Sequence, residues 1–205
     1  RGGQILADIT KDRKIKSVAI TYTNNDYGKG LADVYEAAVK AHGIKVTTVA
    51  AHEDGKADYT AEVSTLASAG GDAIAVIGYL DQGGKGIIQG SLDSGAFDTF
   101  ILSDGMIGDS LTDAFGKNLN KSFGSLPGST GKGAGVFAKV AKDGGIDSSG
   151  PYTGESYDAA ALLILAMQAG GSADRASIAK NVMSVANGPG KKIYPGELKK
   201  ALDLL

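Results

Sequence analysis

The chain has 205 residues and a net charge of −2, with 42% hydrophobic and 21% charged residues. These proportions are typical of a globular protein and give no reason to expect nucleic acid or an anionic lipid surface as a partner. Cysteine is absent, which excludes disulfides, thiol nucleophiles and thiolate metal sites, and no apolar run approaches the roughly 18 residues of a membrane span.

Up to about residue 123, short β-rich runs alternate with helical periodicity. Four runs predict strands, at residues 17–23, 45–50, 72–79 and 99–102. Amphipathic stretches between them predict helices near residues 31–39, 61–69 and 86–93. Strand and helix in alternation indicate βαβ units. We therefore expect an α/β fold, with an open parallel sheet of four strands that is doubly wound.

After about residue 123 the pattern changes to helices without strands. A polar, turn-rich segment at 124–131 leads to helices expected at 136–142, 154–168, 175–186 and 195–205, the last with a proline in its first turn. We expect two domains, 1–123 and 124–205. The second needs an apolar surface that the sequence does not supply, and Arg1 already lies at the start of a helical pattern, so we expect the chain to be a fragment.

Polar and aromatic residues follow three of the expected strands. Tyr27 lies after the first strand, Tyr79 after the third and Asp104 after the fourth. Ligands of open parallel sheets bind outside the carboxyl ends of the strands, so these three side chains are candidates for one site that holds a small polar ligand with an amine. In the alternative interpretation, residues 24–26 only cap the next helix, Tyr27 packs against its own helix and Tyr79 covers the end of the sheet.

Signals for an enzyme are weak. His42 has the position of a helix-end residue and His52 that of a strand-end residue, and neither has a partner at metal-ligand spacing. The glycines at 28–30 lack the third glycine of a dinucleotide fingerprint, and the glycine-rich stretch at 128–133 follows no strand, as a phosphate loop would. We therefore expect no catalytic residue, no cofactor and no metal.

Several segments, taken in order, resemble one family. They run through Asn24-Asn25-Asp26-Tyr27-Gly28-Lys29-Gly30, Asp58-Tyr59-Thr60, Gly71-Asp72-Ala73-Ile74, Leu102-Ser103-Asp104-Gly105 and Gly154-Glu155-Ser156-Tyr157-Asp158-Ala159-Ala160. This series is similar to the branched-chain amino-acid-type (type I) periplasmic solute-binding receptors of ABC transporters. The similarity extends from the first residues to about residue 190.

The resemblance implies two α/β lobes that close on a ligand. Residues 1–123 would be the second lobe, and 124–205 an incomplete part of the first. Tyr27 would line the cleft, Asp104 would take the α-ammonium of the ligand, and Tyr79 and Tyr157 would be further ligand contacts. Asp104 stands where the best-known leucine, isoleucine and valine receptors have glutamate, which leaves the ligand open.

The resemblance also implies a periplasmic or extracytoplasmic location, a small-molecule ligand of the amino-acid type and an ABC permease as partner. One alternative is the ligand-sensing domain of a regulator or receptor with the same fold. Another is a flavodoxin-like enzyme or cofactor carrier. A further possibility is that two copies of the chain associate and cover the helices of residues 124–205, which lack an apolar surface to pack on.

Overall fold

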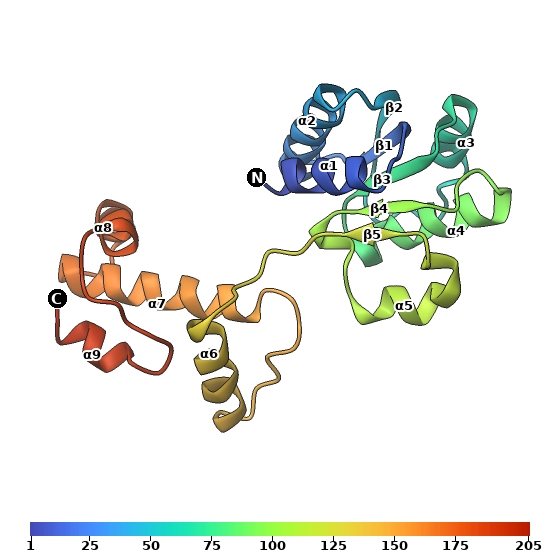
Figure 1. The fold of residues 1–205 in the computed structure, drawn as a ribbon. Helices are drawn as coiled ribbons and strands as arrows, with labels where there is room; N and C mark the ends of the chain where they lie inside the picture. Colours follow the sequence, from blue (N-terminus) through green and yellow to red (C-terminus); the bar gives the residue numbers. More distant parts are fainter. The chain divides into compact units, whose positions relative to one another are not determined.

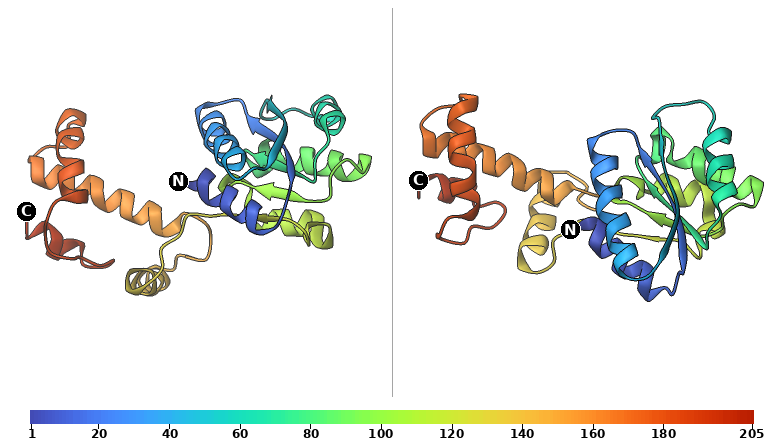
Figure 2. Two further views of the ribbon diagram at one scale, coloured as in Figure 1. Left: turned by 45° about the horizontal axis from the view of Figure 1, so that its top comes forward. Right: turned by 90° about the horizontal axis from the view of Figure 1, so that it is seen from above.

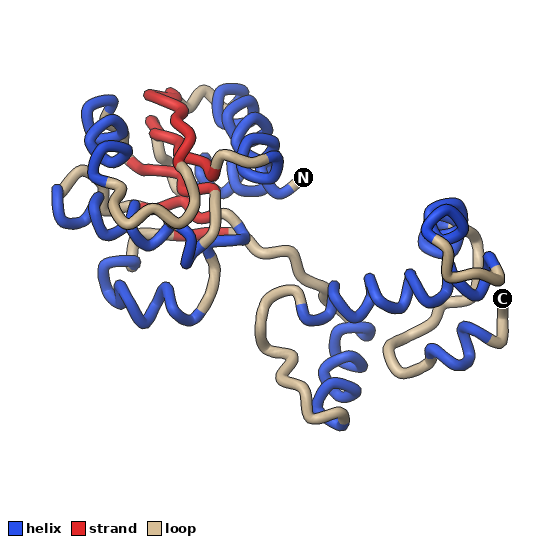
Figure 3. The backbone as a smooth tube through the Cα atoms, turned by 180° about the vertical axis from the view of Figure 1, so that it is seen from behind, coloured by secondary structure: helices blue, strands red, loops and turns tan.

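The computed structural model describes all residues 1–205, which divide into two compact units, Arg1–Pro127 and Gly128–Leu205 (Figure 1). The division falls within the polar segment at 124–131, where the sequence changes character. Unit 1 contains every strand, whereas unit 2 is built from helices and loops (Figure 3). The two units are described separately.

Unit 1 is an α/β fold around a parallel sheet with the strand order β2-β1-β3-β4-β5. The strands are β1 (Ser17–Thr23), β2 (Lys45–His52), β3 (Ala73–Ile77), β4 (Phe100–Leu102) and β5 (Phe123–Gly124). The four expected strands are present, but the expectation of a four-stranded sheet was wrong. The fifth strand has two residues that pair with the end of β4, too few to produce a local pattern.

Helices cover both faces of this sheet (Figure 2). They are α1 (Gly2–Asp12), α2 (Asp26–Ala41), α3 (Thr60–Ala69), α4 (Gly84–Ser94) and α5 (Asp109–Phe115), with 3₁₀ turns η1 (Leu80–Gln82), η2 (Asp104–Met106) and η3 (Gly116–Leu119). Helices α1 and α2 pack in one core with Val18 and Ile20, while α3, α4 and α5 pack in the other with Ala19. Neighbouring β1 side chains thus serve opposite faces.

The position of β3 in the core explains why its sequence is a continuous apolar run. All five of its residues are fully buried, because the sheet is covered on both faces. Helix α2 ends at Ala41, two residues before the expected terminator Gly43, whose φ of +76° lies in the left-handed region that favours glycine. Helix α5 was not expected. Its seven residues are stabilised by the burial of Leu111 and Phe115 rather than by length.

Unit 2 consists of α6 (Lys132–Asp143), α7 (Thr153–Gly170), α8 (Arg175–Asn187) and α9 (Leu198–Leu202). All four expected helices are present, but the last begins three residues later than Pro195, after a turn at Gly196 with a φ of +85°. Apolar side chains on α7 and α8 remain exposed, among them Leu163, Ile164 and Met183. No helix in either unit combines the length and apolarity that crossing a bilayer requires.

Candidate functional site

The candidate site lies at the carboxyl edge of the unit 1 sheet. Tyr27 is in the first turn of α2, directly after β1, Tyr79 follows β3, and Asp104 opens the 3₁₀ turn after β4. Strands β1 and β3 are neighbours, and the chain leaves them in opposite directions, to β2 on one side and to β4 on the other. Open α/β sheets bind ligands at such a switch point.

The position of Tyr27 is set by the way α2 begins close to the end of β1. The Asn25 side chain caps the helix, with its Oδ1 accepting a hydrogen bond from the Gly28 backbone N–H at 2.9 Å. A Cβ on Gly28 would lie 2.1 Å from the carbonyl oxygen of Thr23, the last residue of β1. Glycine at this position therefore lets the helix begin against the strand end, which holds Tyr27 over the edge of the sheet.

A short hydrogen bond joins Tyr27 to Asp104. The Tyr27 hydroxyl donates to Asp104 Oδ1 at 2.6 Å, a distance typical of a bond to an ionised carboxylate. Both residues are partly buried. Burial, which disfavours the phenolate, raises the pKa of Tyr27 to about 12, and the hydrogen bond to Asp104 adds to this rise. The phenol is therefore neutral around pH 7.

Tyr79 forms a second aromatic surface beside Tyr27. The two rings are stacked with centroids 5.3 Å apart and an interplanar angle of 25°, an arrangement that stabilises an aromatic pair beyond its burial. The Asn25 Nδ2 group lies 3.4 Å from the Tyr79 hydroxyl. Asn25 thus caps the helix that carries Tyr27 and also approaches the hydroxyl of Tyr79.

Ser103, which was not among the site residues predicted from the sequence, contacts two segments of the cluster. It is 1% exposed, and its Oγ accepts a hydrogen bond from the Gly78 backbone N–H at 3.2 Å and lies 3.2 Å from the Tyr27 hydroxyl. A Cβ on Gly105 would lie 2.4 Å from the Gly78 carbonyl oxygen. The segments after β3 and β4 are therefore in contact through small residues, and Ser103 joins them to Tyr27 in the segment after β1.

The structure brings together three of the four residues that the sequence singled out. Tyr27, Tyr79 and Asp104 lie on one edge as expected, so Tyr27 does more than pack on its own helix. The alternative interpretation holds for Asn25, which does cap α2. Tyr157 lies in unit 2, where its hydroxyl accepts a hydrogen bond from the Gly196 backbone N–H at 2.8 Å and its ring contacts Phe137.

The chemistry of this edge is that of binding. A carboxylate, two phenol rings and an amide suit a small ligand that carries a cation and an apolar part. No group of three or more histidine, cysteine, aspartate or glutamate side chains is arranged to hold a metal ion. His52 ends β2 at this same edge, as the sequence predicted, but it is buried under the surface rather than placed on it.

The chain matches a known family and several known proteins along most of its sequence. Residues 3–190 match the family model described as periplasmic binding protein. The chain is 30% identical over 181 residues to Leu/Ile/Val-binding protein homolog 1 of Brucella melitensis, which covers 87% of this chain and 47% of that protein. It is 28% identical to an amino acid binding protein of Pseudomonas aeruginosa, and this match covers 91% of this chain and 51% of that protein. The chain thus spans about half the length of these relatives.

Solved structures show the same fold. A type 1 periplasmic binding protein from Bordetella pertussis superposes with a TM-score of 0.73 at 23% identity, covering 89% of this chain and 53% of that one. A leucine binding protein, LivK, from Thermotoga maritima gives a TM-score of 0.70 at 22% identity, covering 88% and 53%. Because the family model matches residues 3–190, which is most of the chain, this chain belongs to the periplasmic binding protein family.

Proposed function

We propose that the chain is the ligand-binding portion of an extracytoplasmic receptor that binds an amino acid and delivers it to an ABC permease. The observation that carries the proposal is the carboxylate of Asp104, held by Tyr27 beside two stacked rings at the carboxyl edge of the sheet. An aspartate fixed in this way is suited to an ammonium group, and the rings are suited to an apolar side chain.

The relatives support the class of ligand. Those that match over most of this chain are named for binding leucine, isoleucine and valine, or amino acids. A more distant solved structure, 16% identical, is a solute binding protein in complex with 4-hydroxybenzoate, which has no ammonium group. The carboxylate of Asp104 therefore favours an amino acid over an aromatic acid for this chain.

In this proposal the bound solute is not altered chemically. Its ammonium group meets Asp104, its side chain lies against Tyr27 and Tyr79, and closure of two lobes around it would favour the bound state. Tyr157 is proposed as a contact from the other lobe. The affinity would come from one charge pair and from burial of apolar surface, without a nucleophile or a cofactor.

Calorimetry on the variant Asp104→Asn tests the proposal. L-leucine should bind at least about 30-fold more weakly, equivalent to about 2 kcal/mol, because a buried ammonium loses its ionic partner. Asp113→Asn on α5 removes one negative charge from an exposed position in the same unit and is the matched control. Equal affinity of both variants would remove Asp104 from the site.

A further inference from the structure

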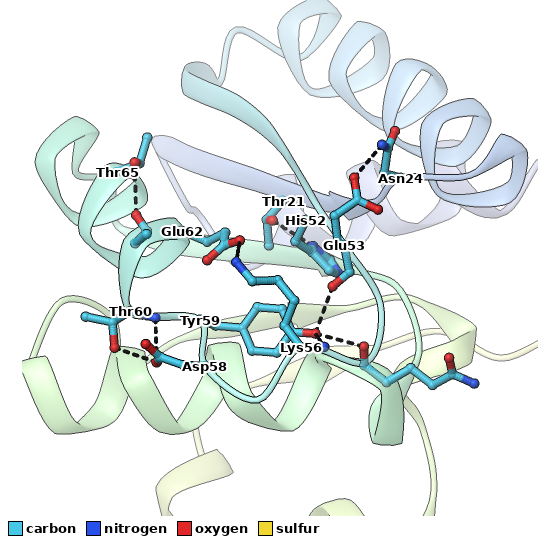
Figure 4. A network of polar contacts seen from close by, with 12 residues as sticks. Thr21, Asn24, His52, Glu53, Lys56, Asp58, Tyr59, Thr60, Glu62 and Thr65 are labelled. Carbon is cyan, nitrogen blue, oxygen red and sulfur yellow. Dashed lines mark hydrogen bonds and ion pairs between the residues drawn. The ribbon is translucent and has the colours of Figure 1, made fainter.

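His52 is buried next to Gly78, the residue that precedes Tyr79 of the candidate site. It is the last residue of β2 and is 1% exposed. Its Nδ1 shares a hydrogen bond of 2.9 Å with Thr21 Oγ1 on β1, and its ring meets the Tyr59 ring edge-on at 6.2 Å (Figure 4). Nε2, the other ring nitrogen, is buried and has no hydrogen-bond partner, which is unusual for a polar atom in a protein interior.

This unpaired nitrogen faces Gly78. A Cβ on Gly78 would lie 3.0 Å from His52 Nε2 and 3.3 Å from Cε1, so the ring rests on the backbone at the end of β3. Gly78 in turn donates its N–H to Ser103 and contacts Gly105 through its carbonyl oxygen. The next residue is Tyr79. A continuous line of contacts therefore runs from the imidazole to the three residues of the candidate site.

Three carboxylates act electrostatically on the His52 ring, and each of them also has a hydrogen-bond or ion-pair partner of its own. Glu53 accepts a hydrogen bond from Asn24, and Glu62 is paired with Lys56 (Figure 4). Asp54 accepts a hydrogen bond from Thr23. Glu62 comes from α3 and keeps one oxygen, Oε2, buried without a partner. All three favour a charged ring, but burial acts more strongly and lowers the pKa of His52 below its usual value.

We propose that His52 is a positioning residue that supports Tyr27, Tyr79 and Asp104 through Gly78 while its ring is neutral, and that a proton on the ring withdraws this support. In this proposal the neutral ring carries its hydrogen on Nδ1, which donates to Thr21 Oγ1, and Nε2 is bare; in the protonated ring both nitrogens are donors. A buried N–H⁺ that faces the Gly78 backbone has no acceptor there, which is costly. The ring then turns towards a carboxylate, for which Glu62 Oε2 is the unpaired candidate, and Gly78 loses its contact.

The site thus becomes sensitive to acid at pH values below the usual pKa of histidine, because burial lowers the pKa of His52. Weaker ligand binding at low pH is the expected consequence, and that consequence alone rests on the proposed function. The structural change itself needs no ligand, so it can be tested independently of whether the chain binds an amino acid.

An NMR titration of the full 205-residue chain, from about pH 7.5 to about pH 5, provides the test, since the carboxylates stay largely ionised over this range. The chain has two histidines, so His42→Gln identifies the ring signal of His52 and serves as the matched control. The backbone amides of Gly78, Tyr79 and Gly105 should shift with the midpoint of the His52 ring, in both the wild type and the control.

In His52→Gln the shifts of these amides should be lost over this range. The comparison of midpoints in the wild type remains decisive if that variant does not fold. The proposal is overturned if the three amides stay unchanged while His52 takes up its proton, if they follow His42 instead, or if they change only when the whole of unit 1 unfolds.

Discussion

The hydroxyl of Tyr27 donates to Asp104 Oδ1 at 2.6 Å, across a sequence separation of 77 residues. This bond joins the first turn of α2 to the turn after β4, so it connects two segments that leave different strands at one edge of the sheet. It also orients a carboxylate beside two aromatic rings. The stability of unit 1 and the properties of the candidate site should therefore both depend on it.

Removing this hydroxyl should destabilise unit 1 without changing its fold. Tyr27→Phe leaves the stacked ring in place but removes the hydrogen bond that Tyr27 donates to Asp104, and we expect a loss of about 1–2 kcal/mol in the free energy of unfolding. Urea denaturation followed by circular dichroism measures this difference. Tyr22→Phe removes the same atom from β1, outside the contact with Asp104, and should cost less. Equal losses in both variants would contradict the assignment.

The raised pKa of Tyr27, about 12, predicts a loss of stability in alkali. The folded state favours the neutral phenol, so its contribution is complete below the ordinary pKa of about 10 and disappears as the pH rises through about 12. Unfolding measured between these values should show a steeper decline for the wild type than for Tyr27→Phe. A decline of the same slope in both proteins would show that Tyr27 ionises normally.

The two glycines of the first turns of α2 should respond in opposite ways to alanine. Gly28→Ala places a methyl group 2.1 Å from the Thr23 carbonyl oxygen and should destabilise unit 1 by about 2 kcal/mol or more. Gly30→Ala adds a methyl group with nothing within 4 Å and should stabilise the helix by up to about 1 kcal/mol. Thermal unfolding of both variants tests the close approach of α2 to β1, which two changes of the same sign would disprove.

The lowered pKa of His52 predicts acid sensitivity of unit 1 as a whole. Because the folded state disfavours the charged ring, stability is complete above the ordinary pKa of about 6.5 and declines as the pH falls through the lower folded value. Urea unfolding at several pH values should show this decline in the wild type and in His42→Gln. It should be smaller in His52→Gln, and an unchanged decline there would assign the effect to other groups.

Much of the fold follows from local patterns. β-Branched residues predict the strand at residues 17–23. Helical periodicity and Gly43 predict helix α2 and its end. These signals all act within a few residues. The site residues Tyr27, Tyr79 and Asp104 could be grouped because the carboxyl ends of parallel strands share one edge. The distances between these side chains could not be predicted from the sequence and are known only from the structure.

The features that sequence reasoning missed depend on tertiary contacts. Strand β5 exists through pairing with β4, and α5 through the burial of Leu111 and Phe115. A signal for α5 was present, since these two residues are four apart and follow an aspartate. Nothing local distinguishes Ser103 from any serine after a strand, or shows that His52 rests on Gly78, because both roles arise from segments that are distant in the sequence.

The most direct test of the account is an NMR titration of the 205-residue chain with L-leucine, compared with 4-methylpentanoate, which lacks only the ammonium group. We expect amide shifts concentrated around Tyr27, Tyr79 and Asp104 for leucine and much smaller shifts for the analogue. Shifts located elsewhere, or of equal size with both compounds, would contradict the claim that Asp104 recognises a cationic group at this edge of the sheet.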